Sequence, residues 1–312
     1  AAPLKSAAIA IGGAVAAQAS KPRVISGMPG LSATGMSPVA TQILRSGKAS
    51  AEEVKAVGSE SIVGLDDRTR IFDTNMAPWR MICAIRCYWG TRLSVGTGAL
   101  IGPNILLTAG HVVFPRDKRS APDEIEIIPA LNGAQRPYGS VKATQIWIHP
   151  RWQEGFELHS DVAAIELDKP IGHELGWFGV TSRSPEELRF EWAHVTGYPG
   201  EKQEAPAAPG GRETAPIVAA QLWHHAAPVL NVLNNRIFYA ADTTPGQSGA
   251  PIYTYDPGAS PVPVIVGVHA YGKASTPVAV GNANSGAWID PGLFDLISGW
   301  REEAAADPSA RR

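Results

Sequence analysis

The sequence predicts an all-β protein with one helix near its C-terminus, and three features carry this prediction. Short apolar runs recur every ten residues or so, roughly the spacing of strands in sandwiches and barrels, and turn-forming residues separate them. The 32 glycines and 26 prolines are typical of a chain with many tight turns. A long amphipathic pattern of helical period appears only after residue 290.

The predicted strands begin with Met81–Trp89 and end with Ala287–Ile289. Those between them are Thr97–Ile101, Ile105–Thr108, Glu124–Ile128, Ala143–Ile148, Val162–Leu167, Ala193–Gly197, Arg236–Ala241, Ile252–Tyr255 and Pro263–Val268. The predicted helix starts after Asp290, whose carboxylate can cap the first turn, and Pro291 suits the first helical position. Its apolar face consists of Leu293, Leu296, Ile297 and Trp300.

The N-terminal sixty residues differ in composition from the rest. Residues 1–19 contain Lys5, an apolar Ala7–Ala17 stretch and an Ala-Gln-Ala end, which predicts a remnant secretory signal, with an Ala-rich tail as the alternative. Residues 20–60 are polar and rich in Pro and Gly, and we predict a pro-segment or linker with one short helix at 51–57. The strand-rich region begins near Ser61.

Composition excludes several classes of protein. The chain carries 27 basic and 29 acidic side chains, so neither nucleic acid nor an anionic membrane is an expected partner. No apolar run reaches the roughly 18 residues of a membrane span. Cys83 and Cys87 lie on one predicted strand, about 13 Å apart, which is too far for a disulfide.

The stretch Asp242–Pro251 contains the candidate nucleophile, Ser248, in the sequence Gly246-Gln247-Ser248-Gly249. A serine hydroxyl needs a base to take its proton and donors that hold the oxyanion formed on attack. Gly246 allows a turn in which the amides of Gly246 and Ser248 point at one spot. Taken alone, this stretch could be an ordinary turn.

Two upstream motifs supply the missing groups. Thr108-Ala109-Gly110-His111 offers a base, and Ser160-Asp161-Val162 offers a carboxylate that can orient it. The order His, Asp, Ser differs from that of α/β-hydrolases and of subtilisin-like enzymes.

This order and its flanking residues resemble the chymotrypsin-like serine proteases. The resemblance implies two six-stranded antiparallel β-barrels followed by a helix, at residues 61–175 and 176–312, with the active site between them. It implies His111 as general base, Asp161 as its orienting partner, Ser248 as nucleophile and no cofactor.

Further motifs resemble the bacterial glutamyl endopeptidases. They are Ser61–Gly64 with Asp66–Arg70, Pro137–Lys142, Ala164–Leu167 with Pro170–Gly172, and Gly197–Gly200. The resemblance implies that His269 and Thr243 bind the acidic side chain of the substrate. An imidazole and a hydroxyl can offset the hydration that a buried carboxylate loses. A core histidine is the alternative for His269.

We therefore expect a secreted, monomeric serine endopeptidase that cuts polypeptides after Glu, and less well after Asp, through an acyl-enzyme. Ala270, Tyr271 and Gly272 should pair with the substrate backbone as an added strand. Self-cleavage between Glu60 and Ser61 would mature a zymogen. The alternatives are a protease of different or broader specificity and a catalytically silent binding module.

Other residues receive no functional role at this stage. We expect no metal site. The histidines without an expected role are His149, His159, His173, His194, His224 and His225. Two departures from the resembling families stand out. Val112-Val113 replaces a common disulfide beside the base, and Gln247 stands where trypsin-type enzymes have the Asp that pairs with a new N-terminus.

Overall fold

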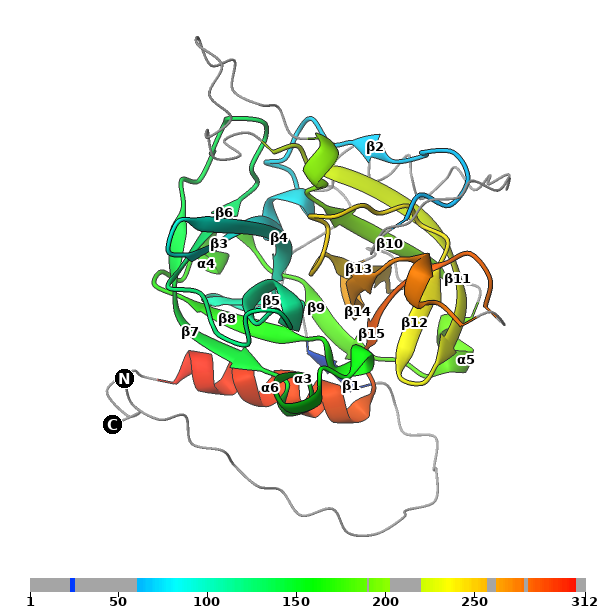
Figure 1. Ribbon diagram of the computed structural model, residues 1–312. Coiled ribbons are helices and arrows are strands. Elements are labelled where there is room, and N and C mark those ends of the chain that lie inside the picture. The colour runs from blue at the N-terminus through cyan, green and yellow to red at the C-terminus, as the bar shows by residue number, and fades with distance from the viewer. Residues whose placement is uncertain are drawn as a thin grey trace.

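Two closed β-barrels lie side by side with a helix beneath them (Figure 1). The computed structural model describes residues 23–25, 61–189, 191–202, 220–256, 262–277 and 280–306. The predicted pair of six-stranded antiparallel barrels with a C-terminal helix is confirmed.

The first barrel contains the strands between residues 82 and 167. They are β3 (Ile82–Trp89), β4 (Arg92–Leu100), β5 (Ile105–Thr108), β6 (Glu124–Pro129), β7 (Val141–Ile148) and β8 (Ala163–Leu167). Their order is β3-β4-β5-β8-β7-β6, every pairing is antiparallel, and β3 pairs with β6 to close the barrel. Aliphatic side chains such as Ile85, Leu106 and Ile165 are fully buried in its core.

The second barrel contains the strands between residues 192 and 288. They are β10 (Trp192–Gly197), β11 (Trp223–Leu233), β12 (Arg236–Tyr239), β13 (Pro251–Tyr255), β14 (Pro263–Tyr271) and β15 (Asn284–Trp288). Pairing runs β14-β13-β10-β11-β12-β15, and the β14–β15 pair closes the ring. The predicted division at 175/176 falls between the two sets of strands and stays a prediction.

Three short strands extend the second sheet, and the sequence did not predict them. β9 (Gly179–Ser182) runs parallel to β14, β1 (Arg23–Ile25) pairs with β9, and β2 (Thr69–Arg70) pairs with β11. The longest strand, β11, was missed as well. It contains Pro228 and a register shift near Asn231, and both interrupt the alternation that reveals a strand.

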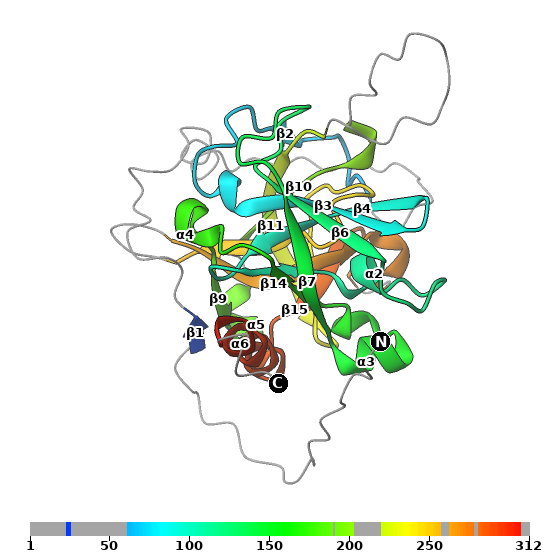
Figure 2. The same ribbon diagram turned by 90° about the vertical axis from the view of Figure 1, so that its left-hand side faces the viewer.

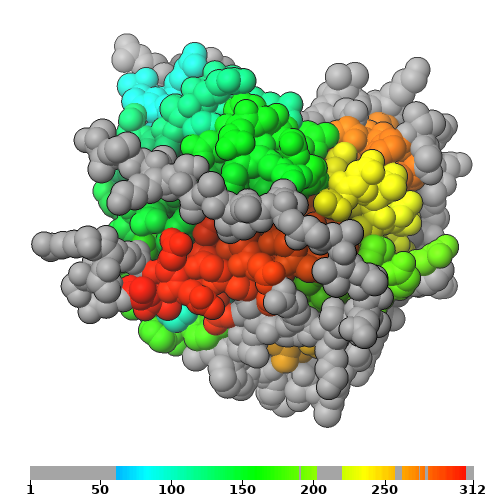
Figure 3. Space-filling model, turned by 90° about the horizontal axis from the view of Figure 1, so that it is seen from below, coloured from blue at the N-terminus to red at the C-terminus, as the bar shows by residue number. Residues whose placement is uncertain are grey.

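The C-terminal helix α6 (Pro291–Ala305) has the predicted cap, because the Leu293 amide donates to Asp290 Oδ1 at 2.8 Å. Its buried side chains include Leu293, Ile297 and Trp300, whereas Leu296 is only partly buried. Figure 2 shows α6 nearly end-on, and Figure 3 shows it (red) on the lower face of the molecule. Among the helices of the described segments, none has the length and apolarity that crossing a membrane requires.

Short helical turns connect the strands. They are η2 (Trp79–Met81), α2 (Gly110–Val113), α3 (Pro150–Gly155), η3 (Leu158–Ser160), α4 (Gly172–Leu175), α5 (Pro185–Leu188), η4 (Gly200–Lys202) and η5 (Lys273–Ser275). The predicted signal remnant (1–19) and helix (51–57) lie outside the described residues. Both cysteines are buried free thiols, and burial raises the pKa of Cys87 to about 12.

Candidate active site

His111 and Asp161 lie together at one end of the first barrel. His111 stands on α2, directly after β5, and Asp161 follows η3 and precedes β8. The Asp161 Oδ2 atom is 2.7 Å from His111 Nδ1, and Asp161 Oδ1 accepts the His111 backbone amide at 2.7 Å. The carboxylate is fully buried, whereas the His111 side chain is 28 % exposed. The ring is thus fixed on its Nδ1 side and accessible to solvent elsewhere.

Tyr271 adds a contact that sequence reasoning missed. Its hydroxyl donates to Asp161 Oδ2, the oxygen that also faces His111 Nδ1. Burial and the neighbouring Asp161 carboxylate raise the pKa of Tyr271, so the hydroxyl keeps its proton and remains a donor. Tyr271 was predicted to pair with substrate backbone, and its side chain has this additional place against Asp161.

The turn that carries Ser248 packs against the segment that leads to His111. The Thr97 amide donates to the Ser248 carbonyl at 2.8 Å. Gly249 has a φ of +84°, and a Cβ added there would lie 2.2 Å from Thr108 Oγ1. Only glycine fits so close to the Thr108-Ala109 backbone in this conformation. The structure therefore brings the Ser248 turn to the same barrel end as His111 and Asp161.

The peptide between Pro245 and Gly246 has a fixed orientation. The Gly200 amide donates to the Pro245 carbonyl at 2.6 Å, and Gly246 has a φ of +103°. In a trans peptide the N–H points opposite to the carbonyl. The Gly246 amide hydrogen is therefore directed away from Gly200.

Arg68 holds Gln247, the residue before Ser248, and sequence reasoning missed this contact. Its Nη1 donates to Gln247 Oε1 at 3.0 Å and to Thr244 Oγ1 at 2.7 Å. Asp66 and Glu201 pair with the guanidinium at 2.8 and 2.6 Å. Burial lowers the pKa of Arg68, but the two carboxylates outweigh it and raise the pKa above its usual value. The Arg68 side chain thus contacts position 247, where trypsin-type enzymes have an Asp that pairs with a free N-terminus.

His269 and Thr243, the predicted specificity residues, are both fully buried in the second barrel. The His269 Nδ1 atom forms a hydrogen bond with the Tyr239 hydroxyl, from β12. Within the described residues, the buried Thr243 hydroxyl has no hydrogen-bond partner. The β13–β14 register ends at Pro251↔Val268, and the Gly249 amide donates to the His269 carbonyl at 2.8 Å. Ala270 lies on β14 beyond this point, and Gly272 follows directly after the strand.

Ser61, the predicted mature terminus, is buried beside these residues. Its amide donates to Asn284 Oδ1 at 3.1 Å, and its carbonyl accepts Asn284 Nδ2 at 2.6 Å. The same carbonyl accepts the Thr243 amide at 3.3 Å, and the Lys273 amide donates to Ser61 Oγ at 3.2 Å. Ser61 therefore joins the segments on either side of the predicted pocket.

Asp67, His225 and Asp242 form a group with metal-ligating atoms. Asp242 already accepts the amides of Val63 at 2.6 Å and Asp67 at 3.0 Å. The Asp242 amide donates to His225 Nδ1 at 2.9 Å, which uses that nitrogen's lone pair. These hydrogen bonds account for the cluster as an anchor of the N-terminal segment, and no metal chemistry is needed to explain it.

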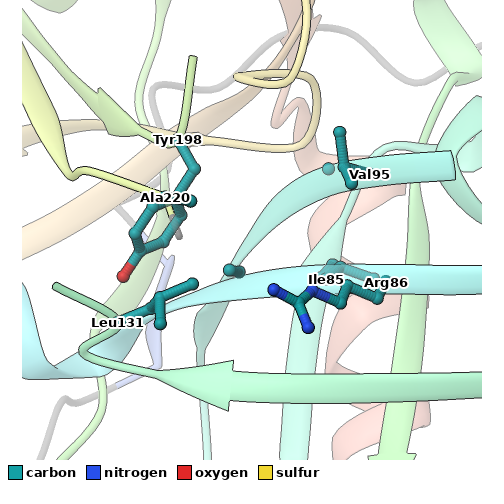
Figure 4. Close-up of a pocket in the computed structure, with 8 residues that line it drawn as sticks. Ile85, Arg86, Val95, Leu131, Tyr198 and Ala220 are labelled. Carbon is teal, nitrogen blue, oxygen red and sulfur yellow. The ribbon is translucent and has the colours of Figure 1, made fainter. Parts of the chain in front are cut away.

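A small hollow is lined in part by residues of β3 and β4. Its lining is mostly apolar and consists of Ala84, Ile85, Arg86, Val95, Gly96, Leu131, Tyr198 and Ala220 (Figure 4). Among these described residues, none is a predicted site residue.

Comparison with known proteins defines the class. Residues 96–259 match the sequence model of the trypsin-like peptidase domain. A solved glutamyl endopeptidase in complex with MPD superimposes with a TM-score of 0.63 at 26 % identity, over 77 % of this chain and 99 % of that one. The chain is thus a chymotrypsin-like serine peptidase.

Two curated relatives narrow the assignment. The glutamyl endopeptidase of Bacillus licheniformis is 32 % identical over 250 residues, which span 78 % of this chain and 70 % of that protein. The protein named extracellular metalloprotease of Bacillus subtilis is 28 % identical over 81 % of this chain and 73 % of its own length. The chain belongs to the glutamyl endopeptidase family.

Proposed function

We propose that the protein is a secreted endopeptidase that cuts polypeptides after Glu, and less well after Asp, through an acyl-enzyme. His111 takes the Ser248 proton and then gives it to the leaving amine. Asp161 fixes the ring tautomer and stabilises the imidazolium. The amides of Gly246 and Ser248 hold the oxyanion, which the fixed Pro245–Gly246 peptide supports.

The observation that carries the specificity is the buried pair of Thr243 and His269. The Tyr239 hydroxyl occupies the Nδ1 side of His269, so Nε2 is the ring nitrogen that can donate to a substrate carboxylate. The Thr243 hydroxyl is a second donor, and burying it without a partner has a cost that a carboxylate ligand removes. Ala270, Tyr271 and Gly272 pair with the substrate backbone at the edge beyond His269.

The test uses two peptides that differ only by Glu or Gln before the cleaved bond. We expect kcat/KM for the Glu peptide to be at least about a hundredfold higher, since a buried donor site that loses its charged partner rejects the analogue. His269→Ala should reduce this ratio more than it reduces hydrolysis of a small activated ester. Similar rates on Glu and Phe peptides contradict the proposal and favour a broader specificity.

We further propose that the protein is a zymogen that matures by cutting its own Glu60–Ser61 bond. The contacts of Ser61 with Asn284, Thr243 and Lys273 support this, because the new α-amine would lie beside the carboxylate pocket. An α-amine with a pKa of about 7.7–8.0 is largely cationic at neutral pH and favours an acidic side chain. N-terminal sequencing should find Ser61 first in the wild type, whereas purified Ser248→Ala should keep the longer chain. A Ser248→Ala protein trimmed at Ser61 rules out self-cleavage.

A further inference from the structure

The second barrel buries a cation beside the proposed pocket. Arg236, on β12, is 6 % exposed. Its Nη1 donates to the Ser275 carbonyl at 2.9 Å, and its Nη2 donates to Ser275 Oγ at 3.0 Å and to Ser285 Oγ. Ser275 belongs to η5, just after Gly272, and Ser285 is the partner of Tyr271 on β15. The guanidinium therefore lies behind the chain segments that follow His269.

No carboxylate is in contact with this cation among the described residues, and Asp161 acts on it electrostatically only from a distance. Within the same residues, Arg236 has a buried Nε without a hydrogen-bond partner. Its other neighbours are aromatic, since the guanidinium carbon lies 4.9 Å from the centroid of the Phe238 ring and 5.3 Å from that of Tyr271. Arginine stays protonated even when it is buried. A buried cation without an anion is destabilising unless a ligand supplies the charge.

The position of Arg236 connects it to both halves of the site. The neighbouring strands β12, β15 and β14 carry Arg236, Ser285 and Tyr271 (Figure 1). Tyr271 contacts the triad carboxylate Asp161, and Tyr239, three residues after Arg236, contacts His269.

We propose that Arg236 is a specificity-determining residue whose charge favours an acidic side chain in the His269–Thr243 pocket. This inference rests on the proposed function and names a permanent positive charge that would act on the pocket in addition to the donors His269 and Thr243 and the proposed Ser61 α-amine. Arg236 acts through the pocket wall, because its hydrogen bonds go to Ser275 and Ser285. In a low-dielectric interior, the electric field of one charge acts beyond the range of a direct hydrogen bond. It therefore affects an ionised Glu substrate and leaves the isosteric Gln substrate unaffected.

The experiment compares kcat/KM for the matched Glu and Gln peptides. Arg236→Met keeps a long unbranched side chain and removes the charge, so the Glu peptide should lose about tenfold. The Gln peptide should stay within about twofold, and Arg236→Lys should keep most of the preference. Arg183→Met is the matched control, since Arg183 is a largely buried arginine whose side chain pairs with Glu191 at 3.2 Å. It should leave the ratio of the two rates unchanged.

A second variant leaves Arg236 in place. Ser285→Asp puts a carboxylate beside the guanidinium and should reduce the Glu preference, whereas the neutral Ser285→Asn should not. If Arg236→Met and Ser285→Asp each reduce kcat/KM equally for the Glu and the Gln peptide, Arg236 only supports the structure around the pocket, and the proposal is overturned. An undiminished Glu preference in both overturns it too. A wild type without Glu preference contradicts the proposed function and this inference together.

Discussion

The two barrels build their parts of the site in different ways. In the first barrel, His111 and Asp161 contact each other directly, above a core of aliphatic side chains. In the second barrel, Arg68 contacts the Ser248 turn and Ser61 contacts the proposed pocket residue Thr243, and both come from a segment that lies outside the two barrels. The second barrel also buries polar rings, including His194 and His224. His111 and Asp161, the proposed proton-transfer pair, are thus held by neighbouring elements, whereas the Ser248 turn and the proposed pocket depend on a segment distant in the sequence.

The largest expected effect comes from removing Ser248, the proposed nucleophile of the second barrel, or His111, its proposed base in the first. Ser248→Ala should reduce kcat by about 10⁶-fold, and His111→Ala by about as much, because the two residues act as a unit. Both variants should melt close to the wild-type temperature. The measurement is hydrolysis of a Glu peptide by freshly purified protein. More than a few per cent of wild-type activity in Ser248→Ala contradicts the assigned nucleophile.

A smaller effect tests whether the segment that carries Arg68 positions the Ser248 turn of the second barrel. Arg68→Ala removes the side-chain donor to Gln247 Oε1 and leaves it only the Thr244 amide. The Ser248 turn should then shift slightly and reduce kcat by about a hundredfold. KM should change much less. The kcat values are calculated per active site, and the active sites are counted by titration. Arg70→Ala removes a charge from the same segment and should stay near wild type. Equal kcat values for the two variants would show that Arg68 does not position the turn.

The smallest effect concerns acid stability of the second barrel. Burial lowers the pKa of His194 to about 4, and burial also lowers that of His224 well below its usual value. The unfolded chain, with histidine pKa values near 6.5, then binds more protons between about pH 6.5 and 4. Stability should therefore fall as the pH drops through this window.

Thermal unfolding between pH 7 and pH 4 measures this effect. His194→Gln removes one of the titrating groups, so its melting temperature should depend less on pH than that of the wild type. A variant with the same pH slope as the wild type would show that His194 does not contribute.

Local sequence predicted the two barrels well, and it placed the proposed catalytic residues in recognisable motifs. Alternating apolar runs revealed most strands, and Asp290 with Pro291 revealed the start of α6. The motifs around His111, Asp161 and Ser248 could be recognised because each motif is a short run of consecutive residues.

Sequence reasoning failed where a contact joins distant residues. Arg68 meets Gln247 across 179 positions, and Tyr271 meets Asp161 across 110. Neither residue has a local pattern that indicates its partner. Tyr239 and Arg236 also looked like ordinary residues of a strand, and only the β12–β15–β14 pairing places them beside the pocket. The sequence predicted roles for Thr243 and His269, which stay predictions, but it did not indicate the side chains that lie around them.

The most direct test of the account is a cleavage profile on a mixed peptide pool, read by mass spectrometry. The wild-type protein should cut after Glu, more slowly after Asp and rarely elsewhere, and Ser248→Ala should give no cuts under the same conditions. Frequent cleavage after Gln or Phe, or cleavage by Ser248→Ala, would contradict a Glu-specific serine endopeptidase.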